Sequence, residues 1–164
     1  MTREQFISRV EGCQRELRRF LASLCCGDTQ LADDIAQEAF IKAFLASGDL
    51  KDPGNFKAWI FRIAHNCFVN NRRSHRISVD YSEAPPIAAP SGADATFRYQ
   101  ALYAALDSLP QHERTALLLF YMEGYSVKEI AEIVEASEEA VKTRLSRGRN
   151  HLRSNPSIIN DYGR

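Results

Sequence analysis

Two stretches of the 164-residue chain place cations and amides at helical spacing, so that they share one side of a helix. One stretch is residues 59–73 and the other is residues 137–153. Arginine, lysine and asparagine side chains can bind phosphate oxygens and can donate hydrogen bonds to the edges of bases. The chemistry that these spacings suggest is therefore recognition of nucleic acid by binding, without catalysis.

The C-terminal stretch has the pattern of a helix-turn-helix over residues 126–153. Ser126 and Glu129 are spaced as a capping box, small Ala131 lets a second helix cross closely, and Ser137 caps that second helix. Glu135 occupies a turn position that often holds glycine, so a left-handed backbone there would cost strain. The second helix is expected to bury one stripe of residues, namely Val141, Leu145, Gly148 and Leu152.

The opposite face of this second helix carries side chains that are able to reach base edges in a major groove. These are Glu139, Lys142, Thr143, Ser146, Arg147 and Asn150, with Arg149 and Arg153 placed for phosphates. A basic, solvated helix of a bundle is the alternative. The combination of cap, small residue, turn, second cap and apolar stripe favours the DNA-binding interpretation.

The N-terminal stretch resolves into two faces on a helical wheel. A polar stripe alternates cations with amides, and it comprises Arg62, Asn66, Val69 and Arg73, flanked by His65, Asn70 and Arg72. Trp59 and Phe61 could stack on unpaired bases, although the position of Trp59 in the apolar stripe favours a core role. Phe56, at the start of this helix, fits either role equally well.

A third surface differs in charge from both basic ones. The predicted helix over residues 32–45 has an outer face that combines acids with exposed aliphatic side chains, namely Asp34, Gln37, Glu38, Ile41 and Leu45. Acids repel DNA, and aliphatic side chains beside them suit a protein partner. A solvated face is the alternative.

The composition has 21 basic and 21 acidic residues, so the net charge is zero, but the charges are segregated. Residues 62–76 hold four arginines and no acid, residues 142–153 hold five basic residues and no acid, and residues 28–38 hold four acids and no base. None of the four cysteines forms a C-x-x-C pair, and Cys25 and Cys26 are adjacent, so neither a metal site nor a disulfide framework is predicted. We expect no cofactor and no catalytic site.

The pattern predicts an all-α chain of two small helical domains. Residues 1–76 form the first, residues 77–96 form a flexible linker with three prolines, and residues 97–164 form the second. No apolar run approaches the roughly 20 residues that span a bilayer, and the charged N-terminus is unlike a signal peptide. We therefore expect a cytoplasmic protein without membrane insertion.

At this point the residues resemble a family. DDIAQEAFIKAF followed by FKAWIFRIAHNCFVNNRR is similar to region 2 of bacterial sigma factors, and LPQHERTALLLFYMEGYSVKEIAEIVEASEEAVKTRLSRGRNHLR is similar to their region 4. The short linker resembles the extracytoplasmic-function group. Glu139 and Ala140 replace the Gly-Thr pair common in that group, and Gly148 stands where alanine is usual. These departures bear on the promoter sequence rather than on the role.

The resemblance implies roles for the three surfaces and partners for the chain. Asp34, Gln37, Glu38 and Ile41 would dock on the clamp helices of the largest subunit of RNA polymerase, and region 4 would also meet the polymerase flap. Arg62, Asn66, Asn70, Arg73 and the loop from Leu50 to Phe56 would open the minus-ten element and hold a flipped base. The minus-thirty-five element would be read by Glu139, Lys142, Thr143, Ser146, Arg147 and Arg149. An anti-sigma factor, with membrane tethering through it, and association with the nucleoid are further expectations.

Two other functions fit parts of the sequence. A helix-turn-helix regulator with an N-terminal sensing or dimerisation domain explains the C-terminal half but not the acidic face or the second basic helix. A helical nuclease would need clustered carboxylates, a glycine-rich phosphate loop or a metal-ligand spacing, and the sequence offers none of these.

Overall fold

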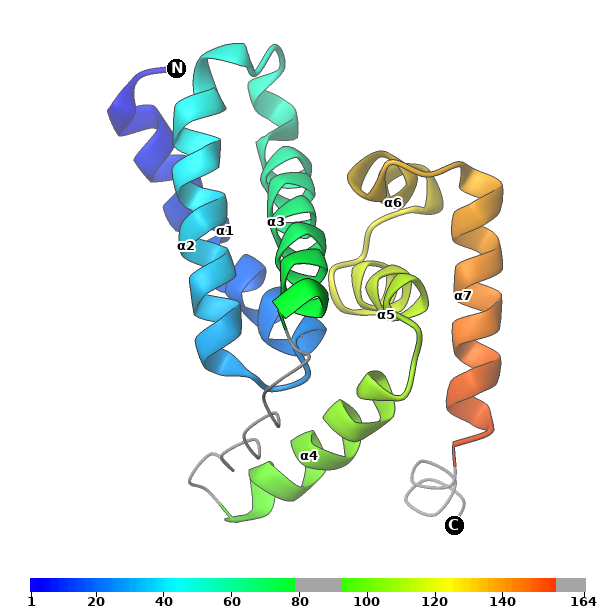
Figure 1. Cartoon of the computed structure of the whole chain (residues 1–164). Helices are drawn as coiled ribbons and strands as arrows, with labels where there is room; N and C mark the ends of the chain where they lie inside the picture. Colours follow the sequence, from blue (N-terminus) through cyan, green and yellow to red (C-terminus); the bar gives the residue numbers. More distant parts are fainter. Residues whose placement is uncertain (79–92, 156–164) are drawn as a thin grey trace.

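The first three helices of the computed structural model form one group (Figure 1). The structure describes residues 1–78 and 93–155, with side chains described for 1–72 and 100–155. Helix α1 (Arg3–Leu24) leads into α2 (Thr29–Ala46), and two short 3₁₀ turns, η1 (Ser47–Asp49) and η2 (Pro53–Asn55), connect α2 to α3 (Phe56–Ser78). The described part of the chain contains helices and no strand, which confirms the all-α prediction.

Local chemistry sets the ends of these helices. Thr2 and Gln5 form a capping box at the start of α1, and Asp28 caps α2 by accepting a hydrogen bond from the Leu31 amide at 3.1 Å. Between them the chain reverses through two residues with positive φ, Cys26 at 54° and Gly27 at 89°. These two residues allow the sharp turn that separates α1 from α2.

The core of this group is aromatic on two helices and small on the third. Phe20 of α1 and Phe61 and Phe68 of α3 are fully buried, with the rings of Phe20 and Phe61 5.3 Å apart. Helix α2 contributes mainly alanines to the interior, which lets its backbone approach the other two helices closely. These are Ala32, Ala36, Ala39 and Ala43.

The remaining helices form a second group. Helix α4 (Ala93–Asp107) precedes α5 (Gln111–Leu117), a π-helical turn η3 (Leu118–Met122), α6 (Val127–Val134) and α7 (Glu138–Arg153). Gly148 explains why α5 and α7 cross closely, since a Cβ there would lie 2.8 Å from Cδ1 of Leu117. Its departure from alanine therefore has a packing reason in this chain.

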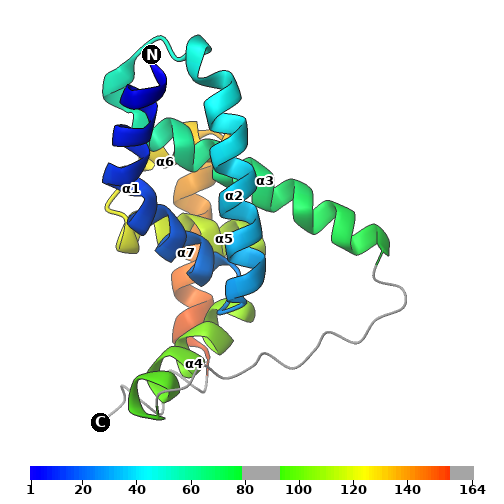
Figure 2. The same ribbon diagram turned by 90° about the vertical axis from the view of Figure 1, so that its left-hand side faces the viewer.

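The expected linker is shorter than predicted at both ends. Helix α3 continues to Ser78 and α4 begins at Ala93, so only residues 79–92 lie between helices, and these fall outside the described residues. Figure 2 shows the C-terminal end of α3 projecting beyond the packed helices. The composition of residues 77–96 favours turns, but helices on both sides extend into that segment.

The two groups pack directly against each other. Arg114 of α5 is buried and donates a hydrogen bond from Nη1 to the carbonyl of Leu24, the last residue of α1, at 2.9 Å. Arg19 pairs with Glu123 at 3.4 Å, and the Phe61 ring meets the Tyr125 ring edge-on at 5.6 Å. Residues far apart in the sequence thus close the chain into one packed unit.

Candidate nucleic-acid interface

Helices α6 and α7 form the predicted helix-turn-helix. The capping box is present, with the Ser126 amide donating to Glu129 Oε2 at 2.8 Å and the Glu129 amide donating to Ser126 Oγ at 3.2 Å. Ser137 Oγ accepts from the Ala140 amide at 3.1 Å and so caps α7. Glu135 adopts the left-handed conformation, with φ 56° and ψ 49°, in spite of the strain that this costs a residue other than glycine.

The outer face of α7 is exposed over its whole length. All six predicted base-reading side chains lie in solvent: Glu139, Lys142, Thr143, Ser146, Arg147 and Asn150. Three of them already have partners within the helix, since Thr143 Oγ1 donates to the Glu139 carbonyl at 3.0 Å and Lys142 lies 3.8 Å from the Glu139 carboxylate. Arg147 pairs with no acid in the part of the chain that is described, so its guanidinium is free to bind a ligand.

Arg149 differs from its neighbours on α7. It is half-buried and donates to the phenol oxygen of Tyr121 at 3.2 Å. Of the predicted buried stripe, Val141, Leu145 and Gly148 are buried and Leu152 is half-buried. The helix therefore presents its cations on one side and packs on the other, as the wheel predicted.

The polar stripe of α3 is only partly accessible. Arg62, Asn66 and Asn70 are exposed, and the side chain of Arg73 lies outside the described residues. His65, predicted to flank the stripe, is 7% exposed, and Nδ1 of its ring has no partner among the described residues. This side of α3 is covered by α6, whose presence a wheel of α3 alone does not reveal.

Two predicted aromatic contacts need correction. Phe61 is fully buried between the Phe20 and Tyr125 rings, so it is not available to stack on a base. Phe56 is 4% exposed and packs against the rings of Phe6 and Trp59, which makes it a core residue. Their apolar surface is satisfied inside the protein, and neither is retained as a DNA contact.

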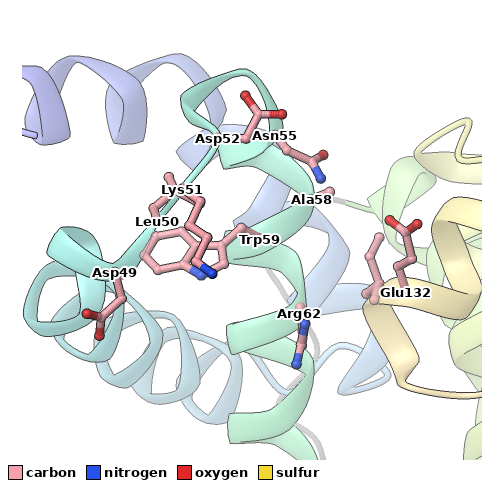
Figure 3. A pocket seen from close by; sticks show the side chains of 10 residues that line it. Asp49, Leu50, Lys51, Asp52, Asn55, Ala58, Trp59, Arg62 and Glu132 are labelled. Carbon is pink, nitrogen blue, oxygen red and sulfur yellow. The ribbon is translucent and has the colours of Figure 1, made fainter.

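Trp59 lies at the edge of the core and lines a hollow of about 260 Å³ beside the loop before α3 (Figure 3). This volume is enough for several water molecules. Helix α6 closes one side of the hollow. The lining residues are Asp49, Leu50, Lys51, Asp52, Asn55, Ala58, Trp59, Arg62, Glu132 and Ile133.

Charged and titratable side chains lie where the two helical groups meet, along a line of contacts called the seam below. Arg62 Nε and Nη2 each lie 2.8 Å from Oε1 of Glu135. The guanidinium of Arg62 on α3 thus forms an ion pair with the turn between α6 and α7. Burial lowers the pKa of the His65 imidazole to about 4, with His112 and Arg144 adding to the shift and Glu135 opposing it. Burial also raises the pKa of the Glu123 carboxyl, while Arg19 opposes that shift.

The outer face of α2 is exposed as predicted. Asp34 and Gln37 lie in solvent, and Ile41 and Leu45 are 61% and 78% exposed. Glu38 is half-buried and pairs with Lys42 at 2.8 Å. The combination of carboxylates with bare aliphatic side chains is the pattern of a protein-binding surface rather than of a DNA-binding one.

Sequence reasoning missed an apolar groove on the second group of helices. This groove of about 540 Å³ runs between α4, η3 and α7, and Leu102 and Tyr121 on its walls are 43% and 62% exposed. Arg149 and Arg153 lie on its rim. Exposed leucine on α4 was a usable signal, but the groove depends on how three helices meet.

Other kinds of site find no support in the described residues. Within those ranges no cluster of His, Cys, Asp and Glu could hold a metal ion. Helices of the described segments are too short or too polar to cross a bilayer. The four cysteines are buried and free, and burial raises the pKa of Cys25 to about 12 and that of Cys26 to about 11, so these thiols stay protonated at neutral pH.

Comparison with known proteins assigns both halves of the chain. The family model for sigma-70 region 2 matches residues 9–77, and the model for sigma-70 region 4 matches residues 99–152. The chain is 37% identical over 140 residues to the ECF RNA polymerase sigma factor EcfG of Rhodopseudomonas palustris, which covers 83% of this chain and 76% of that protein. It is 31% identical over 144 residues to ECF sigma factor SigM of Bacillus subtilis, covering 85% and 87% of the two chains.

A solved structure agrees with these matches. The sigma factor RpoE, crystallised with the anti-sigma factor NepR from Bartonella quintana, superposes with a TM-score of 0.81 at 26% identity over 97% of this chain and 98% of that one. A regulator with an N-terminal sensing domain is not favoured, because the N-terminal half matches region 2. The chain belongs to the sigma-70 family, among the extracytoplasmic-function sigma factors, which bind core RNA polymerase and direct it to promoters.

Proposed function

We propose that the three surfaces divide the work of promoter selection among them. The first helical group binds polymerase and the melted minus-ten element, the second group binds the minus-thirty-five element, and the segment between α3 and α4 tethers the two. Joining two weak contacts on one carrier multiplies their affinities through effective concentration. This is how a chain with zero net charge can select a promoter, since polymerase supplies the general affinity for DNA.

The observation that carries this proposal is the exposed cation-and-amide face of α7 in its capped setting. Ser137 holds the N-terminus of α7, and Lys142, Ser146 and Arg147 project from one side of it. A helix held in this way enters the major groove with its N-terminal half against the base edges. Glu139, Thr143 and Arg149 lie beside them, with Arg149 restrained towards the backbone side by Tyr121.

The hollow beside Trp59 suits an unpaired base of the minus-ten strand. Trp59 offers a partly exposed ring for stacking, and Asn55 and Arg62 provide hydrogen-bond donors at the rim. Leu50 forms an apolar wall, and Asn66 and Asn70 continue the polar stripe along α3, with Arg73 following in sequence. Capturing a base here offsets part of the cost of opening the duplex and needs no chemistry.

Two surfaces suit polymerase. Asp34, Gln37, Glu38 and Ile41 on α2 form the docking face for the clamp helices of the largest subunit. The apolar groove between α4, η3 and α7 fits an amphipathic helix such as one from the flap, because its walls are leucines and its rim is basic.

We also infer an anti-sigma partner, because the similar RpoE was crystallised with one. Such a partner could hold the chain at a membrane, away from the nucleoid.

Replacing Arg147 with alanine tests the central claim. In the holoenzyme, Arg147→Ala is expected to reduce initiation at a promoter with an intact minus-thirty-five element by about tenfold, because a good side-chain contact to a base is worth about 1–3 kcal/mol. Initiation from the same promoter with a scrambled minus-thirty-five element should change little. An equal loss on both templates would show that Arg147 binds only phosphate, and no loss on either would refute its role.

A further inference from the structure

Glu135 stands out because it keeps a strained backbone and yet has a well-defined side-chain partner. Its φ of 56° places a residue with a full side chain in the left-handed region, where glycine would avoid a cost of about 1 kcal/mol. A residue that keeps strain is expected to gain something from its side chain elsewhere. Here the carboxylate meets the guanidinium of Arg62 in the other helical group.

The geometry of this contact resembles that of an arginine on a phosphate oxygen. Two nitrogens of Arg62, Nε and Nη2, converge on the single oxygen Oε1 of Glu135, each at 2.8 Å. A nucleic-acid phosphate offers the same negative oxygen to the same fork. The Nε/Nη2 edge of Arg62 cannot hold both at once, so a phosphate bound at that edge must displace the Glu135 carboxylate.

The same packing also places α6 along one side of the hollow beside Trp59. Glu132 and Ile133 of α6 line it together with Trp59 and Arg62 of α3, as Figure 3 shows for the labelled residues. This wall of the hollow carries the carboxylate of Glu132, which repels a DNA phosphate. The outer face of α7, by contrast, stays exposed.

A promoter requires a different arrangement of the two groups. Minus-ten and minus-thirty-five elements lie about 25 base pairs apart, which is about 85 Å of duplex at 3.4 Å per base pair. In the structure the helix-turn-helix directly contacts the polar stripe of α3, which is the proposed minus-ten surface, through the ion pair between Glu135 and Arg62. The two groups must therefore separate before both elements are bound.

We propose that Glu135 is an intramolecular latch that takes the place of a DNA phosphate on Arg62 and keeps the minus-ten surface closed in the free protein. This inference rests on the proposed role of Arg62. Both side chains of the pair are about half exposed, at 51% and 52%, so the latch is weak enough to be reversible. The free protein is closed to single-stranded minus-ten DNA, while α7 remains able to meet duplex DNA.

The experiment uses the full chain without polymerase and compares Glu135→Gln with Glu138→Gln. Glu138 is the matched control, since it is an exposed acid at the start of α7 with no ion pair to any described residue. The affinity for a single-stranded minus-ten oligonucleotide is measured by fluorescence anisotropy, and protection of residues 58–70 and 126–135 is measured by hydrogen exchange. Glu135→Gln is expected to lower protection in both segments and to raise affinity about three- to fivefold over the control.

Three results would overturn the latch. Unchanged protection in Glu135→Gln would show that the ion pair does not hold the groups together. Lower protection with unchanged affinity would show that closure does not compete with DNA. An equal gain in both variants would indicate a general effect of removing one negative charge. The proposed function fails separately, if Arg62→Ala leaves promoter opening by the holoenzyme unaltered.

Discussion

Arg114 offers the sharpest test of what holds the two helical groups together. Its side chain is 6% exposed and its guanidinium donates three hydrogen bonds to carbonyls: Nε to Leu106 at 2.8 Å, Nη1 to Leu24 at 2.9 Å and Nη2 to Leu109 at 3.2 Å. Asp107 is 4.0 Å away and mostly exposed, so it contributes little. The substitution Arg114→Met keeps an unbranched, flexible apolar stem and removes every donor.

The expected loss in the free energy of unfolding depends on which hydrogen bonds each carbonyl keeps after Arg114 is replaced. Leu106 still accepts a bond from the Leu109 amide at 3.1 Å, while Leu24 keeps only a weak contact from the Cys26 thiol at 3.9 Å. Bonds from charged donors contribute about 1.5–3 kcal/mol each, and two of the three have no substitute of similar strength. Relief from burying a cation offsets part of this. We expect the free energy of unfolding to fall by about 3 kcal/mol.

Urea unfolding followed by circular dichroism measures this loss, and Arg19→Met is the matched control. Arg19 also bridges the two groups, through one bond of 3.4 Å to Glu123. Its own side chain is 56% exposed, but that of Glu123 is 1% exposed, so the loss comes mainly from leaving that carboxyl buried without a partner, and it should stay below the loss for Arg114→Met. Small-angle scattering should show Arg114→Met to be more expanded than Arg19→Met. A loss below about 1 kcal/mol for Arg114→Met would mean that the buried guanidinium is merely tolerated.

Two further predictions concern docking and pH. The double variant Asp34→Arg, Glu38→Arg is expected to lose binding to core polymerase in a pull-down while its circular dichroism spectrum stays unchanged. The control variant Glu4→Arg, Glu11→Arg makes an equal charge change on α1 and should bind normally. Unchanged binding by the first variant would refute the docking assignment. Burial lowers the pKa of His65 to about 4, whereas the imidazole of an unfolded chain titrates near 6.5. Between these two pH values the unfolded chain binds the proton and the folded chain does not, so protonation favours unfolding. The free energy of unfolding should therefore be constant above pH 7 and lower by about 2 kcal/mol at pH 5. A chain carrying His65→Gln should lose this dependence, and an equally steep pH profile in that variant would assign it to another group.

Features that depend on neighbouring residues were predictable from the sequence. The Ser126–Glu129 box and the Ser137 cap each involve residues within four positions of one another, so their chemistry is visible in the sequence. The amphipathic faces of α2 and α7 were predictable for the same reason, since one helix defines each of them. The resemblance to regions 2 and 4 then supplied the order of the domains.

Features that depend on contact between the two helical groups were not predictable in this way. His65 and Phe61 lie on the side of α3 that α6 and the loop at Tyr125 cover, so a wheel of α3 alone assigns them to solvent or to DNA. Arg114 is one charge among many in the sequence. Its burial depends on carbonyls at Leu106 and, 90 residues away, at Leu24.

The strengths of the contacts between the groups suggest an order of events in initiation. The bond from Arg114 to Leu24 is buried, whereas the Arg62–Glu135 pair is half exposed. Opening that breaks the weaker contact first would swing α6 away from α3 while the Arg114 end still holds, much like a hinge. Helix α2, which carries the proposed docking face, lies on the far side of α3 from α6 in Figure 1, and Asp34, Gln37 and Ile41 are exposed in the closed structure, so closure leaves this face accessible. On the proposed assignments, polymerase can therefore engage the closed protein first, and separation of α6 from α3 then exposes the minus-ten surface where melted DNA is being formed. Such an order would keep an isolated chain from binding single-stranded DNA away from polymerase. The Arg62–Glu135 and Arg114–Leu24 contacts between the two groups are sufficient for this order.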